Sequence, residues 1–121
     1  SYTSFEFGQM NTDKTEYTVN DSIEVSFTLK NTGLRKGAEV AQLYVSDPVC
    51  SVMRPAKELK AFEKVFLNPG ESREVILKVP VGSFAFWSEA ENKFVVEPGE
   101  FILSLATSAQ DIKQTLRIQV K

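Results

Sequence analysis

Residues 22–31 read SIEVSFTLKN, and this stretch decides the fold because apolar and polar side chains alternate along its whole length. In a β-strand, successive side chains point to opposite faces, so a period of two places every apolar group on one face. That face carries Ile23, Val25, Phe27 and Leu29. The stretch therefore predicts a strand with one buried face and one face exposed to solvent.

Alternation of the same kind recurs along the rest of the chain. It is found at residues 73–79, 101–106 and 116–120, and shorter segments at residues 2–7 and 94–97 complete the expected set of strands. A single helical turn is expected near residues 81–87, and no helix of ordinary length is predicted. This pattern is typical of short antiparallel strands.

Turn residues separate these segments at short intervals. Asn31-Thr32-Gly33 is expected to end a strand, with Gly33 free to adopt a positive φ. Asn68-Pro69-Gly70 fits a type II turn, because proline presets the first central φ and glycine accepts the second. Residues 97–100 repeat this logic and predict a hairpin. Short strands with frequent turns predict an all-β fold, an antiparallel β-sandwich of about seven to eight strands.

The composition is that of one ordinary globular domain with few residues suited to catalysis or metal binding. The chain has 121 residues, of which 42% are hydrophobic and 25% charged, and we expect a single domain over residues 1–121. Histidine is absent and there is one cysteine, so imidazole-based triads, histidine zinc sites and internal disulfides are excluded. No catalytic residue, metal site or cofactor is predicted.

The net charge and the lengths of the apolar stretches indicate whether the chain could bind nucleic acid or span a membrane. The formal charge is −2, from 14 basic and 16 acidic residues spread along the chain, so no basic face for nucleic acid is predicted. Apolar stretches are only a few residues long, too short for a membrane span. Because the first residues show neither an initiating methionine nor a signal-peptide pattern, we expect the chain to be a piece of a larger protein.

Two central segments depart from the one-sided pattern. In residues 38–46 and 59–67, apolar side chains occupy both sides. The expected core side carries Leu59, Ala61, Val65 and Leu67, whereas the opposite side carries Val40, Tyr44, Phe62 and Phe66. We expect a neighbouring domain to cover that opposite side. The alternative is that the two phenylalanines lie beneath the loop of residues 47–57, and both interpretations stay open.

Other candidate residues cluster in and after that loop. Residues 54–59, RPAKEL, bring two cations and one anion together on a segment that proline keeps extended, so they are candidates to bind acidic groups of a partner. The alternative is that these charges are simply solvated. Cys50 has no histidine to activate it and is interpreted as a plain loop thiol. Trp87, with Phe84 and Phe86, is expected to close one end of the sandwich, the alternative being a platform for sugar rings.

The order of these motifs resembles a known family. The chain contains QLYVSDP at residues 42–48, RPAKELKAFEKV at 54–65, LNPGE at 67–71, FAFW at 84–87 and VEPGEF at 96–101. The series resembles the fibronectin type III-like domain at the C-terminal end of family 3 glycoside hydrolases, the group of β-glucosidases and β-xylosidases. The resemblance runs over nearly the whole chain and implies an immunoglobulin-like sandwich.

The resemblance also implies a role. In this family the nucleophilic aspartate and the acid/base residue lie in upstream domains, so the chain is expected to be a non-catalytic accessory domain that packs on the catalytic domains of its parent chain. Oligosaccharide substrate would be contacted at most indirectly. The candidate interdomain contacts are Arg54, Lys57, Glu58, Phe62 and Phe66, and the candidate loop near the active-site entrance carries Asp47, Arg54 and Lys57.

The resemblance implies a parent enzyme that hydrolyses β-linked glucose or xylose units, in a periplasmic or secreted location. Two alternative functions remain. A carbohydrate-binding module requires exposed coplanar aromatic rings, and a cell-surface adhesion domain of immunoglobulin type requires tandem repeats in the parent chain.

Overall fold

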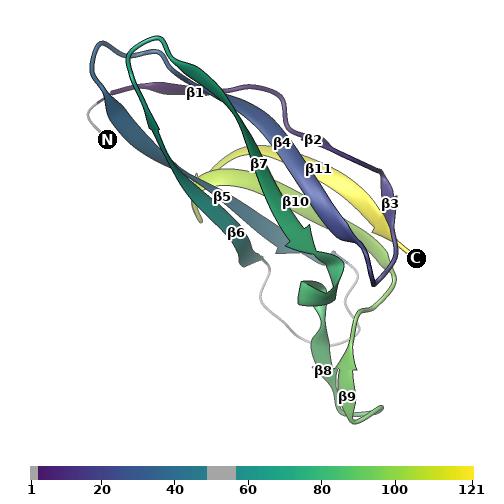
Figure 1. Cartoon of the computed structure of the whole chain (residues 1–121). Helices are drawn as coiled ribbons and strands as arrows, with labels where there is room; N and C mark the ends of the chain where they lie inside the picture. The colour runs from purple at the N-terminus through teal and green to yellow at the C-terminus, as the bar shows by residue number, and fades with distance from the viewer. Residues whose placement is uncertain (1–2, 49–56) are drawn as a thin grey trace.

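Two twisted β-sheets face each other in the computed structural model, which describes residues 3–48 and 57–121 (Figure 1). In the first, sheet A, β4 (Ser22–Asn31) pairs with β7 (Ser72–Pro80) along one edge and with β1 (Phe5–Phe7) and β2 (Asn11–Thr12) along the other. Every pairing in sheet A is antiparallel.

The second sheet, sheet B, has five strands. Their order across the sheet is β3 (Glu16–Tyr17), β11 (Asp111–Val120), β10 (Gly99–Ser108), β5 (Gly37–Ser46) and β6 (Glu58–Leu67). Only the pairing of β3 with β11 is parallel among the described residues. The prediction of an all-β sandwich is confirmed, and very short strands are added to the long ones that the sequence predicts.

The core lies between the sheets and follows the predicted alternation. Along β4, the residues Ile23, Val25, Phe27 and Leu29 are buried, while the polar residues between them are exposed or half-buried. From sheet B, β10 contributes Phe101, Leu103 and Leu105 to the same apolar layer. The sandwich forms because both sheets present a continuous apolar face that only the other sheet can cover.

The segment after β7 forms a small arm outside the sandwich. A 3₁₀ turn at Val81–Phe84 confirms the expected helical turn, and β8 (Phe86–Ser88) then pairs with β9 (Lys93–Val95). The predicted hairpin at residues 97–100 is wrong, because β9 pairs with β8 and β10 pairs with β5 and β11. Gly99 has a φ of +139° and begins β10 in place of completing a turn. The β8–β9 arm projects from one end of the sandwich (Figure 1).

The turn at residues 68–70 forms as predicted. Gly70 has a φ of +77°, and the Glu71 N–H donates to the Asn68 carbonyl oxygen at 3.0 Å. This combination is that of a type II turn, in which the second central residue needs a positive φ. The turn connects β6 of sheet B to β7 of sheet A and thereby joins the two sheets at one edge.

Asn31, the last residue of β4, is fully buried and ties three segments together. Its Nδ2 donates to the carbonyl oxygens of Arg35 at 2.8 Å and Leu67 at 3.0 Å. Its Oδ1 accepts from Thr3 Oγ1 at 2.9 Å and from the Gly33 N–H at 3.0 Å. The side chain therefore satisfies both its donors and both acceptor lone pairs inside the protein.

Gly33 is required here by close packing and not by its backbone angle. Among the glycines of the described residues, only Gly70 and Gly99 have a positive φ, so the predicted positive φ at Gly33 is wrong. A Cβ at position 33 would lie 1.7 Å from Thr3 Oγ1 and 2.8 Å from the Ser4 nitrogen. The N-terminal segment thus passes against residue 33 at a distance that only glycine permits.

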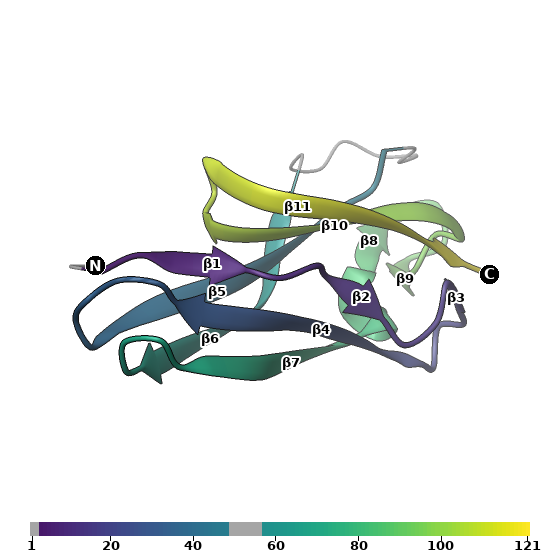
Figure 2. The same ribbon diagram turned by 90° about the horizontal axis from the view of Figure 1, so that it is seen from above.

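The N-terminal segment crosses from one sheet to the other. β1 and β2 pair with β4, whereas β3 pairs with β11 (Figure 2). Between β1 and β2, the Gly8 carbonyl oxygen accepts from Gln114 Nε2 at 2.6 Å, and the Met10 N–H donates to Gln114 Oε1 at 2.7 Å. Gln114 lies on β11, so one amide side chain connects the crossing segment to sheet B.

Tyr17, on β3, is buried with its hydroxyl in a turn. The hydroxyl donates to Asp13 Oδ1 at 2.6 Å, and the Lys14 N–H donates to the hydroxyl oxygen at 2.9 Å. Burial raises the pKa of Tyr17 to about 12, and the hydrogen bond to Asp13 contributes to the rise. Burial also acts to raise the pKa of Asp13, but its hydrogen bonds with Tyr17 and the Glu24 N–H lower it overall.

This raised pKa predicts a loss of stability at alkaline pH. The unfolded chain gives up the Tyr17 proton near pH 10, whereas the folded chain keeps it to about pH 12. The contribution of this group to the free energy of unfolding is therefore fully present below pH 10 and is lost as pH rises from 10 to 12. The expected loss is about 2 kcal/mol. Urea unfolding at pH 8 and pH 11.5 measures it, and Tyr17→Phe should remove this part of the pH dependence. An equal alkaline loss in the variant would contradict the assignment.

Candidate docking surface

The outer face of sheet B, turned away from the core, carries apolar side chains on three neighbouring strands, interleaved with Gln42, Lys64 and Ser104. The register pairs Phe66 with Ala38 and Phe62 with Gln42, and it continues across β5 to β10 through Tyr44 and Ser104. We call this surface the apolar face. Its apolar members are Ala38, Val40, Tyr44, Leu59, Phe62, Phe66 and Ile102.

The aromatic rings of β6 remain open to solvent. Phe62 is 67% exposed and Phe66 is 56% exposed. These values favour the interpretation that another body covers the rings, because the described part of the chain leaves most of their area bare. Neighbouring large apolar side chains on one strand are unusual on the free surface of a soluble protein.

A β-bulge corrects the predicted position of Leu59. The ladder between β5 and β6 pairs Leu43 with Ala61 and then Tyr44 with Leu59, so Lys60 is an extra residue on β6. The shift by one residue moves Leu59 from the predicted core side to the apolar face, because each slip in register exchanges the two sides of a strand. Leu59 is half exposed there.

Two lysines lie against aromatic rings of the apolar face, Lys64 between Phe62 and Phe66 on β6 and Lys57 just before that strand. The Nζ of Lys64 lies 5.2 Å from the centre of the Phe66 ring, and that of Lys57 lies 5.6 Å from the centre of the Tyr44 ring. Lys57 Nζ also donates to the carbonyl oxygen of Ala109 at 2.6 Å, which connects the start of β6 to the turn between β10 and β11. Both ammonium groups are thus placed where cation–π attraction can hold them against aromatic rings.

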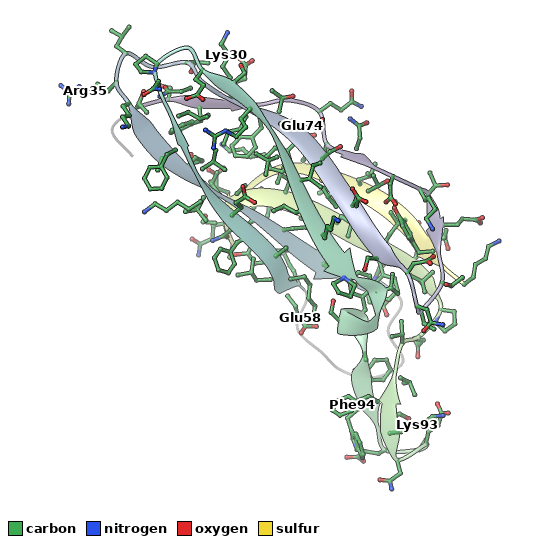
Figure 3. The ribbon with its side chains drawn as sticks, in the orientation of Figure 1. Lys30, Arg35, Glu58, Glu74, Lys93 and Phe94 are labelled. Atoms are coloured by element: carbon green, nitrogen blue, oxygen red, sulfur yellow. The ribbon has the colours of Figure 1, made fainter. Side chains whose placement is uncertain are left out.

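The sequence-predicted contact residues divide between two regions. Phe62 and Phe66 lie together on the apolar face. Lys57 lies at one end of this face, with its ammonium group over the Tyr44 ring. Glu58 lies opposite Val45 on the core side of sheet B and forms an ion pair with Lys60, with 3.6 Å between Oε2 and Nζ. Figure 3 shows Glu58 at the end of β6.

Three predicted positions lie in or beside the loop of residues 47–57. Asp47 follows the last residue of β5 and is partly buried. Arg54 and Cys50 lie outside the described residues. The contribution of Ile102 to the apolar face is not among the sequence-based predictions, although the alternation of residues 101–106 already places it on the second side of its strand. Ala106 lies on the same side but is fully buried.

The outer face of sheet A has a different character. β4 presents Glu24, Ser26, Thr28 and Lys30 there, and β7 presents Ser72, Glu74, Ile76 and Lys78. Ile76 is the only large apolar residue in this set. Figure 3 shows Lys30 and Glu74 on this side of the molecule. The two outer faces therefore differ in character: that of sheet A is mainly polar, whereas that of sheet B exposes Phe62 and Phe66.

The expected aromatic plug is confirmed only for Phe84. Its ring is buried, with 4.8 Å between its centre and that of Phe101. Trp87 is half exposed on the β8–β9 arm and meets Phe94 edge to face, with 5.2 Å between ring centres and 78° between ring planes. Figure 3 shows Phe94 at this arm. The crossed rings do not form the coplanar platform that stacked sugar rings require.

Three carboxyl groups have lowered pKa values because residues at turns or strand ends donate hydrogen bonds to them. A backbone hydrogen bond from Thr18 lowers the pKa of Asp21, one from Asn68 lowers that of Glu71, and the Thr107 hydroxyl lowers that of Asp111. Each of these carboxylates accepts a hydrogen bond from a nearby turn or strand end. Among the described residues, no group of three metal-ligating side chains and no helix able to span a membrane is found.

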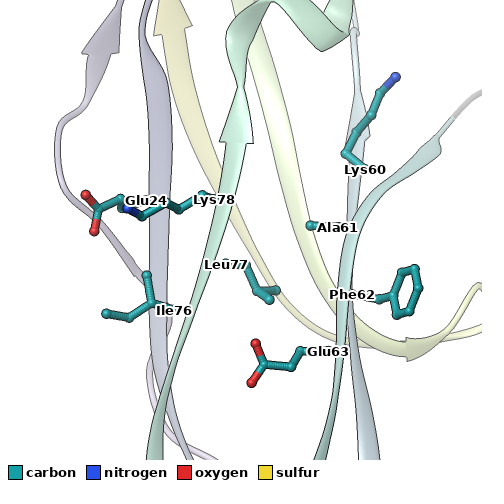
Figure 4. A pocket seen from close by; sticks show the side chains of 8 residues that line it. All are labelled: Glu24, Lys60, Ala61, Phe62, Glu63, Ile76, Leu77 and Lys78. Carbon is teal, nitrogen blue, oxygen red and sulfur yellow. The ribbon is translucent and has the colours of Figure 1, made fainter.

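An open cleft of about 630 Å³ lies at the edge of the sandwich where β6 and β7 face each other. Its apolar lining consists of Ala61, Phe62, Ile76 and Leu77, and its charged lining of Glu24, Lys60, Glu63 and Lys78 (Figure 4). The cleft follows from the topology, because both strands have a free edge on this side of the molecule.

Comparison with known proteins connects this fold to one family. Residues 39–109 match the fibronectin type III-like domain. The thermostable β-glucosidase B of Acetivibrio thermocellus is 43% identical over 120 residues, which are 98% of this chain and 16% of that protein. A putative β-xylosidase of Formosa agariphila is 44% identical over 115 residues, covering 95% of this chain and 15% of that protein.

A solved structure agrees with these sequences. The crystal structure of the GH3 β-glucosidase of Bifidobacterium adolescentis matches with a TM-score of 0.89 at 35% identity, over 98% of this chain and 17% of that one. The chain thus spans only 15–17% of the length of these three relatives. It belongs to the fibronectin type III-like domain family, in the form found in family 3 β-glucosidases and β-xylosidases.

Proposed function

We propose that the chain is a non-catalytic accessory domain whose apolar face packs against the catalytic part of its parent β-glycosidase. The observation that carries the proposal is the contrast between the two outer faces. Sheet A is polar outside, whereas sheet B leaves Phe62 and Phe66 mostly exposed. Interfaces between domains of one chain commonly bury roughly 600–1,500 Å², and a strip that spans three strands of sheet B is suited to an interface of that size.

The relatives support the same assignment. They are glycosidases several times longer than this chain, so we assign hydrolysis of β-glucosides or β-xylosides to the remainder of the parent and place this domain at its C-terminal end. The same comparison favours docking within one chain over the alternative of a cell-surface adhesion domain. Asp47 and Lys57 flank the loop that we assign to the neighbourhood of the active-site entrance.

The partner surface should be apolar and carry acidic groups opposite the two lysines. Lys64 and Lys57 each hold a cation beside an aromatic ring of the apolar face. Lys64 lies between Phe62 and Phe66 on the edge strand β6, so a carboxylate of the catalytic domains can pair with its ammonium group at this edge of the contact. Where such pairs stay exposed they contribute mainly to orientation, since exposed ion pairs are worth about 0–1 kcal/mol.

Charge placed on the apolar face is expected to destabilise the parent enzyme and leave its chemistry intact. In the full-length enzyme, Phe62→Asp combined with Phe66→Asp should lower Tm by several degrees, since desolvating a carboxylate costs several kcal/mol. kcat/KM for a chromogenic β-glucoside, measured well below Tm, should change less than twofold.

Two controls separate docking from folding. Ser72→Asp, at an exposed position on the polar face of sheet A opposite Lys30, adds a similar charge without placing like charges opposite each other and should not lower the melting temperature of the full enzyme. The double Phe variant of the isolated 121-residue chain should melt close to the unmodified chain, because both rings are already exposed. Unchanged melting of the full enzyme in the double variant would refute docking through this face, and release of the dye by the isolated chain would refute the non-catalytic assignment.

A further inference from the structure

β7 is a long, regular edge strand, and within the described ranges of the chain it pairs only with β4. It pairs with β4 from Ser72 to Pro80 with no shift in register. The opposite edge of sheet A is covered by β1 and β2, and β6, the adjacent edge of sheet B, is interrupted by its bulge. Long, flat edges are the ones that accept another strand, whereas bulges and short strands discourage pairing.

The hydrogen bonds at the two ends of the β4–β7 ladder show which backbone groups are free. The Asn31 N–H donates to the Glu71 carbonyl oxygen at 3.0 Å, and the Val81 N–H donates to the Asp21 carbonyl oxygen at 2.9 Å. In an antiparallel ladder, bonded residues recur at every second position. The odd-numbered residues of β7 therefore bond to β4, and the even-numbered residues direct their N–H and C=O groups away from it.

The side chains of these even-numbered residues lie on the outer face of sheet A. Ile76, at the middle of β7, is 46% exposed, and Glu74 and Lys78 lie exposed on either side of it. Neither Glu74 nor Lys78 forms an ion pair within the described part of the chain, although Lys78 lies opposite Glu24 of β4 in the register. An apolar centre is thus flanked, at equal distances along the strand, by charges of opposite sign.

This arrangement is complementary to itself under a two-fold rotation. When a second β7 lies antiparallel to the first with Ile76 opposite Ile76, Glu74 faces Lys78 of the second copy and Lys78 faces Glu74. The free N–H and C=O groups of all three residues then meet those of the partner strand, and each pair exchanges two hydrogen bonds. A slip of two residues places each isoleucine opposite a charge and leaves the remaining charges unmatched.

We propose that two copies of this chain associate through their β7 strands, in this register, to form one continuous sheet from the two copies of sheet A. The interface is isologous, as a two-fold dimer requires, and cross-strand pairs of opposite charge on one face favour it. The open cleft beside β7, whose other wall is formed by Lys60–Glu63 of β6, is the opening through which the second strand would approach (Figure 4).

The proposed dimer goes beyond the docking function, and its strand pairing uses other residues, although Phe62 also lines the cleft beside β7. The apolar face belongs to the outer side of sheet B, whereas β7 is an edge of sheet A. A parent enzyme can therefore pack its catalytic part on Phe62 and Phe66 and associate through Ile76 at the same time. Failure of one proposal leaves the other intact.

Sedimentation equilibrium of the 121-residue chain, and of the full parent enzyme in parallel, tests the dimer. The average mass of the chain should rise with concentration from 13.5 kDa toward twice that value. Glu74→Lys places two lysines opposite each other at both charge pairs and should raise the dissociation constant at least tenfold. Combining it with Lys78→Glu restores opposite charges and should restore the dimer.

A backbone variant gives a second, independent measurement. Ile76→Pro removes an N–H that points away from β4, so the monomer keeps its ladder, as proline is tolerated at such edge positions, while the dimer loses its central hydrogen bonds. Melting temperature checks that each variant is folded. Thr115→Lys, at an exposed position on β11 of sheet B, is the matched control for added charge and should leave the dissociation constant within twofold.

Amide hydrogen exchange identifies the interface. Exchange of the Glu74, Ile76 and Lys78 amides should slow as concentration rises, whereas the odd-numbered amides of β7 should be protected at every concentration. A chain that stays monomeric at millimolar concentration overturns the proposal. So does a dimer in which these three amides keep their monomer exchange rates, or one that the Glu74→Lys and Lys78→Glu pair does not restore.

Discussion

Replacing Asn31 with aspartate is expected to lower the free energy of unfolding by about 4 kcal/mol. A loss of this size is typical when a change leaves an unpaired charge buried inside a protein. Aspartate has the same shape but no N–H groups. The carbonyl oxygens of Arg35 and Leu67, which accept from Asn31 Nδ2 at 2.8 and 3.0 Å, would face a carboxylate oxygen.

The expected loss is large because the site has no access to water. Asn31 is fully buried, so the new carboxylate is either ionised without solvent or protonated at a cost in free energy. Asn31→Ala should cost less, about 2–3 kcal/mol, since it leaves the same carbonyl groups unsatisfied without adding a charge. Thr3→Val, which removes only the bond to Asn31 Oδ1, should cost about 1 kcal/mol.

Urea unfolding at pH 7 measures these three changes. Asn20→Asp is the matched control, because it makes the same chemical change at an exposed turn position and should alter stability by less than about 0.5 kcal/mol. The order of the expected losses, with Asn31→Asp first, Asn31→Ala second and Thr3→Val last, follows from the hydrogen-bond geometry. An Asn31→Asp variant as stable as the unmodified chain would mean that the junction of the three segments contributes little to the fold.

Gln114→Leu is expected to destabilise the domain by about 2–3 kcal/mol, because it leaves two partly buried backbone groups without their hydrogen-bond partner. The Met10 N–H and the Gly8 carbonyl oxygen both bond to this amide, at 2.7 and 2.6 Å. Leucine fills a similar volume, so the loss reports the hydrogen bonds and not a cavity. Gln114→Glu keeps the acceptor for Met10 but loses the donor to Gly8, and it should cost roughly half as much.

Unfolding in urea gives the total change, and amide exchange at Met10 shows where it occurs. That amide should lose its protection in the leucine variant while the β4–β7 ladder keeps its own. Gln119→Leu, an exposed position of the same strand, serves as the control and should change stability by less than about 0.5 kcal/mol. If both variants behave alike, the crossing segment is held by its strand pairing and not by Gln114.

The docking surface shows how far alternation alone can predict a site. Counting in twos places Phe62 and Phe66 on the second side of their strand, and the structure puts both on the outer face of sheet B. The same counting fails for Leu59, because one extra residue at Lys60 exchanges the two sides of the strand beyond it. A bulge is set by pairing with the neighbouring strand, which a single segment of sequence does not contain.

The arm formed by β8 and β9 gives a second such case. Pro98 and Gly99 are turn residues, and the local pattern predicts a hairpin at that position. In the folded chain β9 pairs with β8, while β10 finds two partners in sheet B. β10 pairs within sheet B and not with β9, because the central position in a five-stranded sheet buries far more apolar surface than a local hairpin does.

What the sequence by itself determined is local: the buried side of β4, the type II turn at residues 68–70, and the absence of histidine chemistry. These depend on side-chain alternation and on the φ preferences of proline and glycine, which act within a few residues. What only the tertiary structure decided is the set of contacts between distant residues, among them the burial of Asn31 and the free edge of β7 with its matched charges. Such features arise because a residue is buried or left exposed by neighbours far away in the chain, and no short stretch carries that information.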